Sequence, residues 1–211
     1  MNSFQLKWIA VLTMAIDHTG AVLFPENVVL RCIGRIAFPI FCFLLVEGVF
    51  YTRNVYKYMG RLALFALLSE VPFDLALYGV PLELRHQNVF FTLLCGVAMI
   101  CFLERYRDWY IRGLVIVAFV WAAEAMMSDY GSSGILLILI YYVSRDCRKA
   151  GIAAGVGWNL LLFRGIQRWG AAASVPIALY NGKKGTGMKY FFYVFYPAHL
   201  LLLYGIKKCL G

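Results

Sequence analysis

Apolar stretches of membrane-spanning length follow one another along this 211-residue chain, yet several of them contain charged side chains. An α-helix that crosses the hydrocarbon layer needs about 20 mostly apolar residues. An ionisable group in that layer costs roughly 2.5–3.5 kcal/mol, so it normally faces a protein interior or a wet cavity. These charged groups therefore predict a buried polar site inside a membrane protein. In the first three apolar runs they are Asp17, His18, Arg35, Glu70 and Asp74.

The composition favours a membrane protein, because 62% of the residues are hydrophobic and only 15% are charged. A soluble domain of this length normally carries far more polar surface. We expect an all-α, polytopic integral-membrane bundle of about eight or nine helices, formed as a single domain over residues 1–211. Prolines within the spans should kink their helices: Pro39, Pro72, Pro176 and Pro197. The expected spans lie near residues 6–24, 31–50, 60–79, 88–104, 110–127, 133–145, 149–164, 166–180 and 190–207.

The net charge of +9 could indicate nucleic-acid binding, but the positions of the basic residues argue against it. They lie in short loops between the expected spans, where such residues usually set membrane topology. When successive loops are placed on alternate sides, most of the 20 Lys and Arg residues fall on the side of the N-terminus. The positive-inside rule therefore places the N-terminus in the cytoplasm. The six cysteines show no metal-ligand spacing, and we expect no metal site.

His18 is the strongest candidate for a general base, because histidine titrates near neutrality and lies here in an apolar run. Its neighbour Asp17 points about 100° away on a helix, so the two side chains do not form a simple dyad. Each needs a partner from another span. As catalytic residues beside His18 we consider Asp17, Glu70 and Asp74, one of which would orient or neutralise the base. In the structural alternative, Asp17 pairs with Arg35 and His18 bonds a backbone carbonyl.

Glu70 and Asp74 stand four residues apart and therefore share one helix face. Two carboxylates on one face repel each other unless a cation or a proton lies between them. Arg35 is the intramembrane cation, and its planar fork suits a carboxylate. We therefore expect Arg35 to pair with Glu70 or Asp74, either within a substrate site or in an ion-pair network that only fixes helix packing. Glu47, near the inner end of the second span, belongs to the site or snorkels to the interface.

Other polar residues near the spans have both a functional and a structural interpretation. Asn88 can cap the fourth span or bind substrate, and Asp129 lies toward the same outer face. His86 is a second proton carrier or a solvated loop residue. His199, inside the last span, is a functional group or a packing residue. The polar groups share one layer, toward the exterior.

Several stretches of the sequence, found in the family's order, resemble the TraX family of membrane proteins. The best-known member acetylates the N-terminus of pilin. The resemblance therefore implies a membrane acyltransferase of the bacterial inner membrane that uses acetyl-CoA, with an envelope polymer, glycan or peptide N-terminus as acceptor. Residue by residue, the resemblance favours Asp17, His18, Arg35, Glu47, Glu70, Asp74, Asn88 and Asp129. The matching stretches are MAIDHTGAVLF (14–24), GRIAFPIFCFLLVEG (34–48), RLALFALLSEVPFDLALYG (61–79), NVFFTLLCG (88–96), DYGSSGILLIL (129–139), LYNGKKG (179–185) and FYPAHLLLLY (195–204).

An acyl-CoA donor would approach from the cytoplasm, whereas the polar layer lies toward the exterior. The donor's phosphates need cationic partners on the inner side. The candidates are Arg53, Lys57, Arg61, Lys183 and Lys184. Topology alone would also explain these charges.

Three functions remain open from the sequence. The first is an acyltransferase in which a histidine deprotonates an acceptor amine or hydroxyl. The second is a proton-coupled transporter or flippase whose carboxylates and histidines relay protons, although the sequence shows no internal repeat of the kind such proteins often have. The third is a non-catalytic membrane assembly factor.

Overall fold

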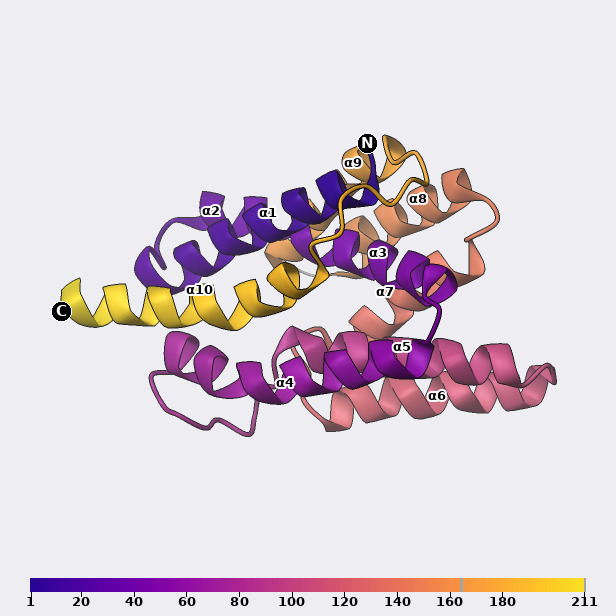
Figure 1. Cartoon of the computed structure of the whole chain (residues 1–211), viewed down its shortest axis with the longest axis horizontal. Coiled ribbons are helices and arrows are strands. Elements are labelled where there is room, and N and C mark those ends of the chain that lie inside the picture. The colour runs from indigo at the N-terminus through magenta and orange to yellow at the C-terminus, as the bar shows by residue number, and fades with distance from the viewer. Residues whose placement is uncertain (164, 211) are drawn as a thin grey trace.

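The computed structural model describes residues 1–163 and 165–210, apart from the side chain of Lys189, and their regular structure is helical (Figure 1). This confirms the all-α class expected from the sequence. In chain order the elements are α1 (Ser3–Leu23), α2 (Val28–Gly34), α3 (Ala37–Tyr51), α4 (Val55–Leu77), α5 (Val89–Arg105), α6 (Trp109–Ala125), α7 (Gly131–Val143), α8 (Arg148–Gly157), the π-helix η1 (Trp158–Leu162), the 3-10 helix η2 (Gly165–Ala173), α9 (Ser174–Ala178) and α10 (Lys189–Leu210).

The local sequence explains where several helices begin and where one breaks. Asparagine side chains accept hydrogen bonds from first-turn N–H groups of α1, α2, α4 and α5. The second expected span, 31–50, is divided at Arg35 into α2 and α3, because Pro39 has no N–H to bond the Arg35 carbonyl. Pro72 and Pro197, in contrast, lie inside α4 and α10, which continue through them.

The expected spans 149–164 and 166–180 are helical in their described residues but are not regular α-helices throughout, and position 164 lies outside the described residues. The first consists of α8 followed by the π turn η1, and the second consists of η2 followed by the short α9. The η2 helix packs closely against η1 at Gly170, because a Cβ added there would lie only 2.4 Å from the Asn159 side-chain oxygen.

Within the described residues, two helical stretches are long and apolar enough to cross a membrane, Ser3–Leu23 and Val28–Tyr51. Other helices are also apolar on their exposed faces. Large hydrophobic side chains are exposed on α4, where they are Leu64, Leu67, Leu68 and Val71, and on α6, where they are Leu114, Val117 and Trp121.

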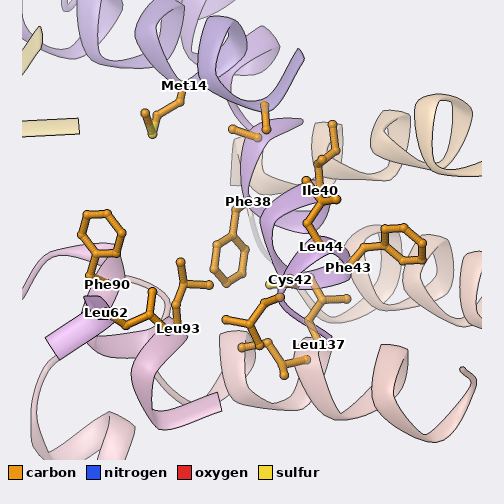
Figure 2. Packing of buried hydrophobic residues seen from close by; sticks show 14 of the residues in the cluster. Met14, Phe38, Ile40, Cys42, Phe43, Leu44, Leu62, Phe90, Leu93 and Leu137 are labelled. Carbon is orange, nitrogen blue, oxygen red and sulfur yellow. The ribbon is translucent and has the colours of Figure 1, made fainter. Parts of the chain in front are cut away.

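Helix α3 lies at the centre of the packing (Figure 2). Its buried residues include the uninterrupted run from Cys42 to Val46, which a helix shows only when neighbours cover most of its surface. The helix packs against α1 on one side and against α7 and α5 on another. Helix α10 lies between α1 and α4, while α4, α5 and α6 lie side by side (Figure 1).

The bundle has two distinct ends. At the end where the chain starts, the Met1 amino group donates to the Leu179 carbonyl, and Ser3 N–H donates to the Lys183 carbonyl at 2.8 Å. We call this the N-terminal end. The last turn of α1, helix α2 and the C-terminus lie at the opposite end (Figure 1). There the loops 78–88 and 126–130 are joined by an isolated bridge between Gln87 and Ser128.

Candidate functional site

Two glycines allow α1 and α2 to approach each other at the end opposite the N-terminus. A Cβ on Gly34 would lie 2.1 Å from the Asp17 Cβ, and a Cβ on Gly20 would lie 2.8 Å from the Leu30 Cβ. Neither position has room for a larger residue. This close approach places the basic side chains of Arg31 and Arg35 directly against Asp17.

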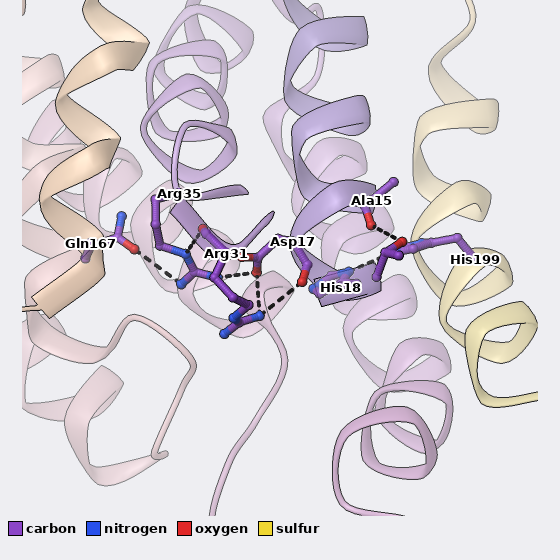
Figure 3. A network of polar contacts seen from close by, with 8 residues as sticks. Ala15, Asp17, His18, Arg31, Arg35, Gln167 and His199 are labelled. Carbon is purple, nitrogen blue, oxygen red and sulfur yellow. Dashed lines mark hydrogen bonds and ion pairs between the residues drawn. The ribbon is translucent and has the colours of Figure 1, made fainter. Parts of the chain in front are cut away.

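Asp17 is the centre of a buried ion-pair network (Figure 3). Its Oδ2 atom accepts from Arg31 Nη1 at 3.0 Å and from Arg35 Nη2. Arg35 Nη1 also donates to the Gln167 side-chain oxygen at 3.3 Å. The Asp17 side chain is only 8% exposed, so its carboxylate interacts with these arginines instead of with solvent. Two guanidinium groups facing one carboxylate leave an excess of positive charge.

The expected pairing of Arg35 with Glu70 or Asp74 is wrong, because Arg35 pairs with Asp17. The short loop after α1 turns α2 back along α1, so both arginines face the first helix and not the third span. Among the described residues, Glu70 and Asp74 form no ion pair. The alternative that Asp17 pairs with Arg35 is the one that the structure contains.

His18 contacts His199 of α10, and no carboxylate is among its described hydrogen-bond partners (Figure 3). The distance from His18 Nδ1 to His199 Nε2 is 2.6 Å, and His199 Nδ1 lies 2.8 Å from the Phe195 carbonyl oxygen. A carbonyl oxygen can only accept, so His199 carries its proton on Nδ1 and accepts at Nε2. His18 must then donate from Nδ1. This leaves the Nε2 lone pair of neutral His18 free to accept a proton.

A cavity of about 40 Å³ lies beside this pair, and we call it the His18 cavity. Asp17, His18, Asp129 and Tyr130 line it together with apolar side chains of α3. Part of the Asp129 surface is open, yet protein surrounds the carboxyl group, and this desolvation raises its pKa to about 6 although Arg35 opposes the shift. The structure thus brings Asp129 to the site, as the sequence predicted.

Glu70, Asp74 and Asn88 serve a neighbouring structure, the loop between α4 and α5. Asn88 Nδ2 donates to Glu70 and, at 2.8 Å, to the Ala66 carbonyl, while Asn88 Oδ1 caps α5. Asp74 accepts from the Glu83 N–H at 2.8 Å. None of the three bonds His18 in the described structure. No described contact with His18 therefore supports the expected catalytic role of Glu70 and Asp74. The capping role of Asn88 is confirmed.

His86 lies in the same loop, and its ring stacks on Tyr78 with centroids 5.7 Å apart. The backbone of Gln87 joins this loop to the one that carries Asp129, with Asp129 N–H donating to the Gln87 carbonyl at 2.9 Å. His86 is therefore close enough to influence Asp129 electrostatically, but it does not line the His18 cavity.

The N-terminal end has a larger cavity, of about 420 Å³, between α3, α7 and α8. Glu47 lines it, so this carboxylate is separate from the His18 group. Neither Lys57 nor Arg61 lines it. The loop carrying Lys183 and Lys184 supplies Gly182, while neither lysine lines the cavity and both are exposed.

Two arginines line this larger cavity. In the sequence they stand out only as loop charges that set membrane topology. They are Arg145 and Arg148, on either side of the turn between α7 and α8. Their only sequence signal was the dense basic run RDCRK at 145–149. Such a run is typical of an inner loop, so the sequence did not distinguish these two residues from other loop charges.

These features define an all-helical protein in which a buried arginine–aspartate network and a histidine pair meet at one small cavity. The chain belongs to the TraX protein family, whose family model matches residues 3–207. The family membership expected from the sequence motifs is thereby confirmed.

The chain is also similar to two individual bacterial proteins. It is 30% identical to a probable fimbrial assembly protein FimC, serogroup H1, of Dichelobacter nodosus, over 99% of this chain and 97% of that protein. It is 27% identical to an uncharacterised protein of Rickettsia prowazekii, over 66% of this chain and 54% of that protein. No solved structure matches this chain significantly.

Proposed function

We propose that this protein is an integral-membrane acyltransferase that moves an acetyl group from acetyl-CoA to an acceptor of the cell envelope. The observation that carries the proposal is the hydrogen-bond chain from His18 through His199 to the Phe195 carbonyl. It holds His18 in the tautomer whose Nε2 is unprotonated, at the edge of a cavity. A fixed, neutral imidazole with a free nitrogen is what a general base requires.

The surface supports placing the whole bundle in the bacterial inner membrane. Leu114, Val117 and Trp121 are each more than 60% exposed along one face of α6, and α4 has a comparable stripe. A water-soluble monomer rarely exposes continuous apolar surface of this extent, whereas lipid covers it without cost. The basic loops gather at the N-terminal end, so we place that end in the cytoplasm.

The proposed reaction begins when His18 Nε2 removes a proton from an acceptor amine or hydroxyl. The acceptor atom then forms a bond to the thioester carbonyl carbon, and the C–S bond breaks. The thiolate of CoA leaves and takes up the proton held by His18, so the base returns to its starting state. Excess positive charge from Arg31 and Arg35 favours the oxyanion that forms during attack.

A second candidate is a non-catalytic role in the assembly of a surface fibre. The name of the Dichelobacter nodosus relative, a probable fimbrial assembly protein, favours this alternative. In that case the polar network of α1, α2 and α10 would serve only to fix helix packing.

Incubation of the purified protein with acetyl-CoA labelled in the acetyl group and with envelope extracts distinguishes the two functions. The acyltransferase proposal predicts label in an envelope component that grows with time and with protein concentration. An assembly factor gives no transfer above the protein-free control.

A further inference from the structure

The large cavity at the N-terminal end combines an apolar wall with convergent polar groups. Its volume of about 420 Å³ is that of a small-molecule site. We call it the Arg145–Arg148 cavity. Phe43, Val46, Ile152 and Ile177 supply its apolar wall. Glu47, Tyr51, Ser144, Arg145 and Arg148 supply its polar groups.

This cavity is separate from the His18 cavity. Successive helical residues turn by about 100°, so residues that line one cavity should share a face of α3. Phe38 and Phe41 line the His18 cavity, whereas Phe43, Val46 and Glu47 line the Arg145–Arg148 cavity. The two sets lie on roughly opposite faces of α3. The larger cavity therefore needs its own explanation.

The two arginines are held in place while most of their donors stay available. The Arg145 guanidinium carbon lies 3.7 Å from the centre of the Phe50 ring, a stacking contact that uses no N–H group. Among the described residues it forms an ion pair with Asp146, which is 3.6 Å long and joins an aspartate side chain that is 95% exposed. Arg148 donates one bond from Nη1 to the Tyr180 carbonyl. A guanidinium has five N–H donors, so both forks can still bind an oxyanion.

The first turn of α8 lies at the wall of this cavity, since Arg148 and Gly151 line it. Cys147 precedes α8 without a side-chain capping bond, so the first N–H groups of the helix lack that partner. Glu47 of α3 also lines the cavity, and its carboxylate accepts N–H or O–H groups. It already interacts with the Tyr180 hydroxyl, and its remaining lone pairs can accept from a ligand. The cavity therefore offers two cations for an anionic group and one acceptor for a donor group, with apolar surface alongside.

We infer that the Arg145–Arg148 cavity binds a ligand that carries a phosphate together with an N–H or O–H donor and an apolar portion. The phosphate is held between the two guanidinium groups, where bidentate contacts are strongest. The donor group faces Glu47, and the apolar portion lies along Phe43, Val46 and Ile152. Both a nucleotide-type cofactor such as coenzyme A and an anionic phospholipid have this chemistry. The inference does not depend on acetyl transfer at the His18 cavity, although its coenzyme A case would locate the donor of the proposed function.

The test measures equilibrium binding of two labelled probes, coenzyme A and phosphatidylglycerol, to the purified full chain in an uncharged detergent. Arg145→Ala and Arg148→Ala are compared with Lys149→Ala, which removes the same charge from an exposed neighbour on α8 that does not line the cavity. We expect one probe to bind, and each arginine variant to weaken it by about tenfold or more, as for a hydrogen bond to a charged group. Lys149→Ala should change its Kd by less than about threefold.

The probe that binds identifies the source of the phosphate. Binding of coenzyme A in this pattern makes the ligand a soluble nucleotide, and binding of phosphatidylglycerol makes it a lipid. If an alanine variant fails to fold, Arg145→Lys and Arg148→Lys take its place. They keep the positive charge but cannot make the bidentate contact of a guanidinium group, so they should still weaken binding of the probe. The inference is overturned if neither probe binds, or if the arginine variants behave like Lys149→Ala. Binding needs no turnover, so a chain that binds a probe but transfers no acetyl group contradicts the proposed function alone.

Discussion

The position of one proton decides what His18 can do. His199 accepts from His18 only while its own Nδ1 proton is held by the Phe195 carbonyl, so this backbone carbonyl, one hydrogen bond beyond His199, fixes the tautomer of His18. A backbone carbonyl has here the orienting role that a carboxylate has in many hydrolases. In the proposed acyl transfer, His199 would therefore act as a positioning residue for His18.

Replacing the His199 ring tests this positioning role. His199→Phe keeps a flat ring but removes the acceptor, so the His18 ring can rotate or change tautomer. We expect the kcat for acyl transfer to fall about tenfold or more while the acceptor KM stays nearly unchanged. His199→Gln, which retains an acceptor oxygen, should recover part of the rate. Equal losses in both variants, or a change confined to KM, would assign His199 to packing or to substrate binding.

The Asp129 carboxyl makes the stability of the folded protein depend on pH, and the direction of this dependence follows from its raised pKa. Its pKa is raised in the folded protein from 3.8 to about 6, because desolvation disfavours the charged carboxylate. The folded state therefore holds this proton more tightly than the unfolded state does, and its stability falls as pH rises from about 4 to 6. We expect Asp129→Asn to remove this loss, so the variant gains thermal stability relative to the native chain between pH 4 and pH 7.

The matched control for that measurement is Asp146→Asn, since the Asp146 side chain is 95% exposed. It should leave the pH dependence of the melting temperature unchanged. A native chain that gains stability over this range relative to Asp129→Asn would reverse the assigned sign and contradict the desolvated environment of Asp129.

The sequence predicts which residues form the polar site better than it predicts their partners. Asp17, His18 and Arg35 stand out because a charge inside an apolar run must be compensated. Their contacts depend on tertiary packing: His18 meets His199 at a separation of 181 positions, and no local pattern gives that pairing. The assignment of Arg35 to Glu70 or Asp74 failed because helix spacing cannot show which neighbouring helix an arginine faces.

The ion-pair network around Asp17 depends on the close approach of helices α1 and α2. Gly34→Ala places a methyl group 2.1 Å from the Asp17 Cβ, and no side-chain rotation relieves that contact. We expect α2 to be displaced and the protein to lose about 1–3 kcal/mol of stability, as in other overpacked sites. Thermal unfolding of the purified protein measures the loss.

A second glycine provides a control for the Gly34 experiment. Gly113 lies inside α6 with nothing within 4 Å of the Cβ position, so Gly113→Ala should stabilise by about 0.5–1 kcal/mol. Similar small gains in both variants would mean that α1 and α2 are not closely packed.

Helix positions could be predicted from long apolar runs, as in α1, α4 and α5, and Asn88 could be predicted as the cap of α5. The structure of residues 158–163 and 165–178 could not be predicted, because their hydrophobicity indicates a regular span and no residue pattern shows the π, 3-10 and short α turns that they form. The break before α3 has a visible cause in Pro39, but the sequence does not show whether a proline bends or divides a helix. Pro72 and Pro197 leave their helices continuous.

The orientation of the whole molecule can be tested with its own cysteines. Cys147 precedes α8 at the N-terminal end, and Cys209 lies in the last turn of α10 at the other; both are exposed. In variants that keep only one of them, a membrane-impermeant maleimide added to intact cells with a permeable outer membrane should label Cys209. Cys147 should react only after the inner membrane is opened. The reverse pattern would place the N-terminus outside.

The central proposal is that His18 is the base of an acyl transfer, and the rate of His18→Ala tests it most directly. The assay follows labelled acetyl groups from acetyl-CoA into envelope material, with thermal unfolding showing that each variant is folded. The matched control is His86→Ala, which removes a histidine from the adjacent loop that does not line the His18 cavity. We predict that His18→Ala lowers the transfer rate by about 10²-fold or more while His86→Ala stays near the native rate. A folded His18→Ala variant that transfers acetyl groups at nearly the native rate would contradict the assignment.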